Sequence, residues 1–155
     1  MDRIEPVRKI IDELILTIQD DDERRCAYIH LYGVSQLCAL LAYKRNCDAE
    51  LSVIAGLLHD IYSYTNMDPS DHAHKGAEMA RSILTPLKSF NDEEVSLICS
   101  AIYNHSDKCN IHDAFDEVLK DADVMQHCLY NPAQKKKEAE EQRFDVLKTE
   151  LGLNY

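Results

Sequence analysis

Apolar residues recur every three or four positions along most of the chain, which is the spacing of helices that bury one face. In the first such segment, residues 4–19, this face comprises Val7, Ile11, Leu14 and Ile18. Similar segments follow, separated by short polar stretches. We predict an all-α, compact bundle of six to seven helices, at about residues 4–19, 22–44, 50–64, 71–84, from 91 onward, 113–129 and 132–152.

Polar residues mark several of the predicted helix starts. Asn91 precedes Glu94 by three residues, which is the pattern of a capping box. Three acidic residues at 20–22 favour the start of the second helix. Asn131 and Pro132 indicate an N-cap and a first helical position for the last helix.

The composition agrees with one helical domain. Of the 155 residues, 45% are hydrophobic and 29% are charged, with four glycines, four prolines and no tryptophan. This length suits a single domain, and the scarcity of helix-breaking residues favours helices. We expect residues 1–155 to form one domain with a core at about 22–130, on which the first and last helices pack.

The charge limits the partners that we expect. The net charge is −11 and the chain has no basic stripe, so we expect no nucleic acid polymer and no membrane as a partner. The stretch KKKEAEEQR, residues 135–143, is interpreted as a solvated helix face. A small phosphorylated substrate stays compatible with an acidic chain, because a bound cation reverses the local field. The oligomeric state is left open between monomer and homodimer.

The cysteines and the N-terminal residues indicate a compartment. The six cysteines form no C-x-x-C pair, and Cys26, Cys38 and Cys99 fall in helical patterns, as small buried hydrophobic residues do. The N-terminal residues do not follow the pattern of a signal peptide, and no run of about 18 apolar residues is present. We expect a cytoplasmic protein with reduced thiols.

Several polar residues interrupt the apolar faces. His59 and Asp60 stand side by side within the apolar run GLLHDIYSY. The helical spacing also turns other polar residues inward, while it turns His74 and Asp121 outward. The inward residues in the other helices are His30, His72, His105 and Asp123.

The simplest interpretation of one inward histidine is a hydrogen-bonded core residue. Six such residues on five helices need a common explanation, because each unpaired buried carboxylate or imidazole costs roughly several kcal/mol. A shared divalent cation removes that cost, since imidazole nitrogens and carboxylate oxygens are both good ligands for it. Gly76, one turn after His72, would leave room beside that side chain.

The order of these residues resembles the H…HD…D signature of the HD-domain superfamily of metal-dependent phosphohydrolases. The resemblance spans about residues 26–129 and includes the phrases AGLLHDI, HAHKGAEMA, AIYNHSDK and LKDADVM. It implies that one metal is bound by His30, His59, Asp60 and Asp123. In small stand-alone bacterial members with an H…HD…H…H…D pattern, further histidines bind a second metal and the aspartate of the doublet bridges the two ions. His72 and His105 match these positions, and His74 is a substitute for His72 that the helical spacing disfavours.

The resemblance implies hydrolysis of a phosphoester or phosphoanhydride bond, in a nucleotide or another small phosphorylated molecule, by a metal-activated water. Asp60 would be catalytic as the bridging ligand, and Lys108 is our candidate for stabilising the phosphoryl oxygens, ahead of Lys75. The alternative, which we favour for either lysine on its own, is an ordinary solvated side chain. His127 is interpreted as a surface residue, with a place beside the ligands as the alternative. The mixed nitrogen and oxygen ligands favour iron or manganese, with nickel, zinc, cobalt or magnesium also compatible.

Two other classes of function stay open from the sequence. Some proteins of this fold use the same ligand pattern for a di-iron centre that oxidises carbon bonds. A non-catalytic module would keep the metal for stability and sense a nucleotide. A helical bundle with unrelated core histidines is the purely structural alternative.

Overall fold

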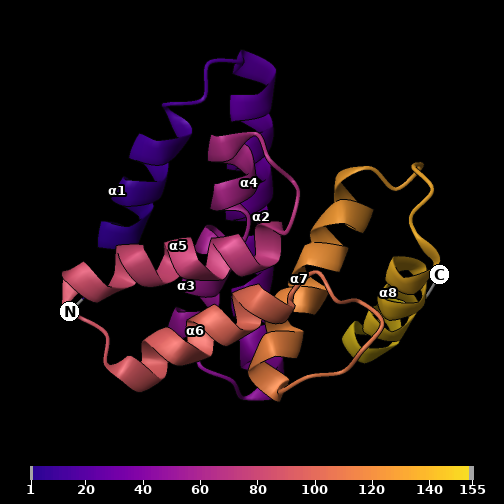
Figure 1. The fold of residues 1–155 in the computed structure, drawn as a ribbon. Helices are drawn as coiled ribbons and strands as arrows, with labels where there is room; N and C mark the ends of the chain where they lie inside the picture. The colour runs from indigo at the N-terminus through magenta and orange to yellow at the C-terminus, as the bar shows by residue number, and fades with distance from the viewer. Residues whose placement is uncertain (1, 154–155) are drawn as a thin grey trace.

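Eight α-helices account for most of residues 2–153, the part of the chain that the computed structural model describes. This part contains no strand (Figure 1), so the predicted all-α class is confirmed. The helices are α1 (Ile4–Ile15), α2 (Asp21–Arg45), α3 (Ala49–Leu58), α4 (Ile61–Asn66), α5 (His72–Leu87), α6 (Asp92–Asn104), α7 (Ala114–Tyr130) and α8 (Glu138–Leu151).

The long helix α2 forms the centre of the bundle and packs against α3 and α7. Helix α3 is buried along its whole length from Leu51 to Leu58, so it lies in the interior of the bundle. A Cβ atom on Gly56 would lie 2.7 Å from the Cα atom of Ser35. The absence of a side chain at Gly56 therefore allows α2 and α3 to approach closely.

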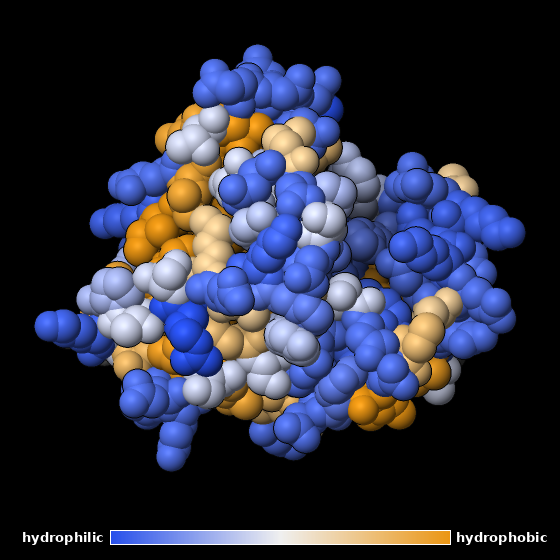
Figure 2. All heavy atoms as spheres, in the orientation of Figure 1, coloured by the Kyte–Doolittle hydropathy of each residue, from blue (hydrophilic) through white to orange (hydrophobic). Residues whose placement is uncertain are grey.

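Two helices cross the front of the bundle in Figure 1 and cover α3. Helix α5 packs on α6, and α6 packs on α3 and α7. Helix α1 packs on the other end of the bundle through Val7, Ile11 and Ile15, which are fully buried. On this face of the molecule the surface is mostly hydrophilic, with hydrophobic side chains visible mainly between α1 and α4 (Figure 2).

Several predicted helix boundaries agree with the structure. Asp20 caps α2 by accepting hydrogen bonds from the N–H groups of Asp22 and Glu23. Asn91 and Glu94 form both hydrogen bonds of the predicted capping box at the start of α6. These boundaries depend on residues within one helical turn, which is why local sequence identifies them.

Three predicted boundaries were wrong. The helix predicted at residues 50–64 is divided by a break at His59–Asp60 into α3 and α4. The last helix begins at Glu138, not at Pro132, because residues 132–137 are polar or small and leave nothing to bury on a helical turn there. Helix α1 ends at Ile15, and the following residues form a turn in which Thr17 bonds back to Leu14.

Arginine side chains fasten α8 to the bundle. Arg143 donates hydrogen bonds to Glu117 and Asp121 of α7, at 2.7 and 2.9 Å. Arg45 of α2 bonds Asp121 and Glu150, at 2.8 and 2.7 Å. Asp121, which the helical spacing placed toward solvent, is therefore buried, because two arginines from distant segments neutralise it.

Among the described helices, α2 alone is long and apolar enough, by length and composition, to cross a membrane. Central helices of water-soluble bundles pass the same test, and the apolar residues of α2 pack against α3 and α7. All six cysteines are free thiols; Cys38 and Cys99 are buried as predicted, whereas Cys26 is half-buried.

Candidate metal centre

Six predicted site residues meet at one place in the bundle although they come from separate segments. They are His30 on α2, His59 and Asp60 at the α3–α4 break, His72 at the start of α5, His105 at the end of α6 and Asp123 within α7. Their ligand atoms form overlapping groups in which every atom lies within 4.8 Å of the others.

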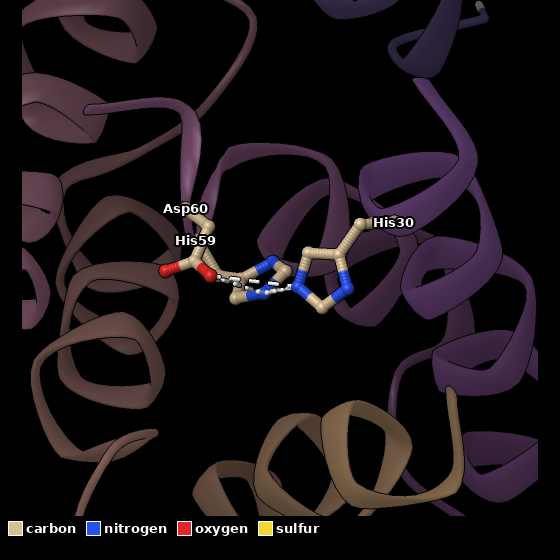
Figure 3. Close-up of side chains that lie close together, drawn as sticks. All are labelled: His30, His59 and Asp60. Atoms are coloured by element: carbon tan, nitrogen blue, oxygen red, sulfur yellow. Dashed lines mark hydrogen bonds and ion pairs between the residues drawn. The ribbon is translucent and has the colours of Figure 1, made fainter. Parts of the chain in front are cut away.

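The break between α3 and α4 positions the doublet. His59 ends α3 with helical backbone angles, and Asp60 departs from them with φ −115° and ψ 7°. This departure turns the Asp60 carboxylate toward the imidazole of His59 and toward His30 (Figure 3). In an uninterrupted helix, adjacent side chains would point about 100° apart.

The two carboxylate oxygens of Asp60 face different pairs of histidines. The Oδ2 atom lies 3.4 Å from Nε2 of His30 and 3.6 Å from Nε2 of His59. The Oδ1 atom lies 3.3 Å from Nε2 of His105 and 3.6 Å from Nε2 of His72. Asp60 therefore stands between two histidine pairs, with one oxygen toward each.

Asp123 is a second carboxylate close to the first histidine pair, His30 and His59. Its Oδ1 atom lies 3.5 Å from Nε2 of His30 and 3.9 Å from Nε2 of His59. Its Oδ2 atom accepts a hydrogen bond of 2.6 Å from the Lys108 ammonium. Lys108 thus fixes the carboxylate so that Oδ1 points toward the histidines.

The outer nitrogens of the four histidines all have oxygen partners. The Nδ1 atoms of His59, His72 and His105 lie 2.8, 3.0 and 2.6 Å from the backbone carbonyls of Gly56, Pro69 and Ile102. The Nδ1 atom of His30 lies 2.9 Å from Oε1 of Gln126. Because a carbonyl only accepts, each Nδ1 carries the hydrogen, and in the neutral imidazole each Nε2 presents a lone pair to the centre.

No hydrogen-bond donor among the described residues faces these acceptor atoms. The Nε2 atoms of His30 and His59 face each other at 3.0 Å, as Figure 3 shows. The Oδ1 atoms of Asp60 and Asp123 are buried and have no hydrogen-bond partner among the described residues. Electron pairs that converge without a hydrogen between them are stabilised by cations, so this donor set fits divalent metal ions.

Burial and charge shift the pKa values of the same groups. Burial lowers the pKa of His59 to about 3, against the attraction of Asp60. Burial opposes the charge on Asp60, yet the neighbouring histidines, His59 first, hold the pKa of that carboxyl well below its usual range. Both shifts favour the forms that bind metals, which are the neutral imidazole and the carboxylate.

The Lys108 ammonium, which we expected to face the phosphoryl oxygens of a substrate, is engaged by acceptors within the protein. Besides Asp123, its ammonium donates to the carbonyl of His105 at 2.7 Å and approaches that of Lys120 at 3.4 Å. Its three hydrogens therefore have partners within the protein. The other candidate, Lys75, pairs with Asp68 at 2.9 Å and does not line the pocket at the metal centre.

His72 and His74 have different surroundings. His72 is beside Asp60, whereas His74 pairs with Asp71 and stacks on the ring of Tyr103. We expected Gly76 to leave room for the His72 side chain, and this was wrong. The carbonyl oxygen of His59 occupies the space at Gly76.

His127 lies closer to the centre than its interpretation as a surface residue suggested. Its Nε2 atom is 3.5 Å from Oδ1 of Asp123, its ring stacks on His30, and its Nδ1 atom is 3.0 Å from Glu140. Its side chain is 42% exposed. The spacing of four residues from Asp123 was the signal in the sequence.

A pocket of about 340 Å³ opens at the centre. Asp60, His72, His105 and Asp123 line it, together with Lys137, Ala139 and Glu140 from α8 and the segment before it. The remaining lining residues are Ser106, Asp107, Lys108, Cys109 and His127. A small molecule in this pocket would lie directly against the histidine and carboxylate cluster.

Comparisons with known proteins found a matching family model and a solved structure with a similar fold. The family model described as HD domain matches residues 27–128, a range that contains all six residues of the cluster. A solved structure of a predicted HD superfamily hydrolase from an uncultured Thermotogales bacterium is similar, with a TM-score of 0.62 and 23% identity. The similarity covers 94% of this chain and 87% of the other. No curated protein matches.

Proposed function

Because the chain belongs to the HD-domain family, we propose that it is a metal-dependent phosphohydrolase that cleaves a phosphoester or phosphoanhydride bond in a small phosphorylated molecule. The placement of Asp60 between two histidine pairs is the observation that supports this proposal most strongly. The solved structure with the similar fold is described as a predicted hydrolase, which agrees with it.

Two metal ions fit the proposal better than one. His30, His59, Asp123 and Oδ2 of Asp60 would hold the first, and His72, His105 and Oδ1 of Asp60 the second. Divalent ions held by these residues would supply polarisation of a phosphoryl group and activation of water for attack on phosphorus. The nitrogen and oxygen donors favour iron or manganese over the softer metals.

The residues of the chain contribute orientation and charge. The carbonyls of Gly56, Pro69 and Ile102 hold three imidazoles with Nε2 toward Asp60. Lys108 keeps Asp123 in place, and its positive charge at the pocket wall would offset charge that develops on phosphoryl oxygens. Direct contact with a phosphate would require Lys108 to release one of its present acceptors.

Metal analysis followed by an activity screen tests the proposal. Protein purified without chelator is analysed for metal content, then assayed with iron, manganese and nickel on a panel of nucleotides and phosphomonoesters. We expect close to two ions per chain and release of phosphate or of a phosphorylated product. Bound metal with no hydrolysis of any phosphate would contradict the proposal, and oxygen consumption by the iron-loaded protein would point to the oxygenase class.

A further inference from the structure

The seven residues between α7 and α8 contain three consecutive lysines, Lys135, Lys136 and Lys137. The sequence pattern favoured a solvated helix face for them. In the structure they precede α8 and line a second pocket of about 340 Å³, together with His127, Tyr130, Gln134 and Glu140. Three residues, His127, Lys137 and Glu140, line both this pocket and the one at the metal centre, so the two pockets adjoin.

The lysines differ in whether their ammonium groups are engaged. Lys136 donates to the carbonyl of Asn131 at 3.2 Å. The ammonium groups of Lys135 and Lys137 form no hydrogen bond or ion pair with the described residues, and both side chains are exposed. Lys137 lines the metal-centre pocket itself, so its ammonium is available to a molecule bound there.

The acidic side chain that lines both pockets, Glu140, forms no ion pair with these lysines. Glu140 lies at the junction of the two pockets, and its Oε1 atom is 3.0 Å from Nδ1 of His127. The chain as a whole carries a net charge of −11, which repels polyanions. The lysine segment is therefore a local cationic wall beside a site that, once loaded with metal, attracts phosphate.

We propose that Lys135 and Lys137 bind a second phosphate group of the substrate, so that the preferred substrates are molecules with at least two phosphate groups. This inference rests on the proposed function. One phosphate at the histidine cluster would be held through the metals, and a phosphate farther along the molecule would pass His127 and reach the two ammonium groups. Lysine suits this role because its three donors bind phosphate oxygens in many orientations.

The test compares the binding of one and of two phosphates without turnover. Calorimetry on the manganese-loaded protein measures the affinity for orthophosphate and for methylenediphosphonate, whose carbon bridge resists hydrolysis. The variant K135Q/K137Q removes both charges, and K9Q/K44Q, two exposed lysines on α1 and α2, is the matched control for net charge.

We expect K135Q/K137Q to weaken methylenediphosphonate binding about tenfold and orthophosphate binding less than about twofold, with the control unchanged. An equal loss for both probes, no loss, or the same loss in the control would each overturn the inference. Circular dichroism checks the fold, and the single variants K135Q and K137Q, each with a loss of about threefold expected, serve if the double variant does not fold.

The substrate screen distinguishes this inference from the function on which it rests. If the wild-type protein hydrolyses phosphomonoesters as well as molecules with two phosphates, and K135Q/K137Q behaves as wild type, the lysine inference fails and the hydrolase stands. If no phosphate compound is hydrolysed by metal-loaded protein, the proposed function itself fails.

Discussion

The carbonyl oxygen of His59 lies where a side chain on Gly76 would have to be, since a Cβ atom there would approach it to 2.9 Å. Helix α5 thus rests directly on the α3–α4 break. This contact sets the distance between His72, at the start of α5, and Asp60, in the break.

We expect G76A to destabilise the protein by about 1–3 kcal/mol, because the neighbouring atom is backbone and cannot yield easily. For a chain of this size each kcal/mol lowers Tm by about 2–4 °C. The variant should also lose manganese affinity, since α5 carries His72. Thermal unfolding with and without Mn²⁺ measures both effects. In the control G33A the new Cβ meets Cγ of Gln126 at 3.1 Å, a flexible side chain, so its Tm should fall less.

Asp60 should be indispensable for metal binding and dispensable for folding. In D60N an uncharged amide replaces the carboxylate and leaves one oxygen for the two histidine pairs, so metal content should fall to a small fraction of the wild-type value and hydrolysis below detection. Metal analysis and circular dichroism are the measurements. D107N changes another carboxylate of the same pocket and should retain metal. Full metal content in D60N would contradict the assignment.

Lys108 is expected to act mainly through Asp123. The variant K108Q loses the 2.6 Å bond to Oδ2 of Asp123, and loss of such a supporting partner typically costs about 10- to 100-fold in metal affinity or activity. Calorimetric titration with Mn²⁺ should therefore show weaker binding. Unchanged metal affinity with a lower kcat would instead indicate that Lys108 acts on the substrate phosphate. K75Q, which removes an ammonium that pairs with Asp68 outside the pocket, is the control.

The attachment of α8 should be sensitive to acid. Burial opposes the charge on Glu117, but Lys120, Arg143 and the N–H of His112 hold its pKa below the usual 4.5. Because its pKa is lowered in the folded state, Glu117 contributes to stability in full above pH 4.5. This contribution is lost as the pH falls through the folded-state pKa.

Replacement of Glu117 by glutamine should therefore reduce the acid dependence of stability. Between pH 7 and pH 4, the urea midpoint of wild type should fall more than that of E117Q. E13Q, at an exposed position of α1, should follow wild type. Parallel pH profiles for wild type and E117Q would show that this carboxylate has no such role.

The sequence predicted the fold class and the residues that meet at the centre because both depend on short-range regularities. Helical spacing turned His30, His105 and Asp123 toward the core, and the packing of α2, α6 and α7 then brought them together. Asn91 and Glu94 were equally readable, because a capping box lies within one turn.

What the sequence did not predict depends on pairs that are distant along the chain. Asp121 is buried because Arg45 and Arg143 both reach it, from 76 and 22 residues away. The start of α8 was placed too early because Asn131 and Pro132 signal a helix wherever they occur, whereas the apolar residues that could pack begin later. Lys135, Lys136 and Lys137 were predicted on a solvated helix face, but they precede the start of α8 and line a pocket.

Main-chain acceptors orient three of the four central imidazoles, at Gly56, Pro69 and Ile102. A substitution at Pro69 or Ile102 retains the carbonyl, so it leaves the electron-donating strength of the imidazole nearly intact, whereas a side chain at Gly56 would meet the backbone of Ser35. His30 alone depends on a side chain, that of Gln126. A substitution of Gln126 can therefore change the basicity of the His30 imidazole without moving the backbone. We expect related proteins to differ in the reactivity of this centre first through this residue.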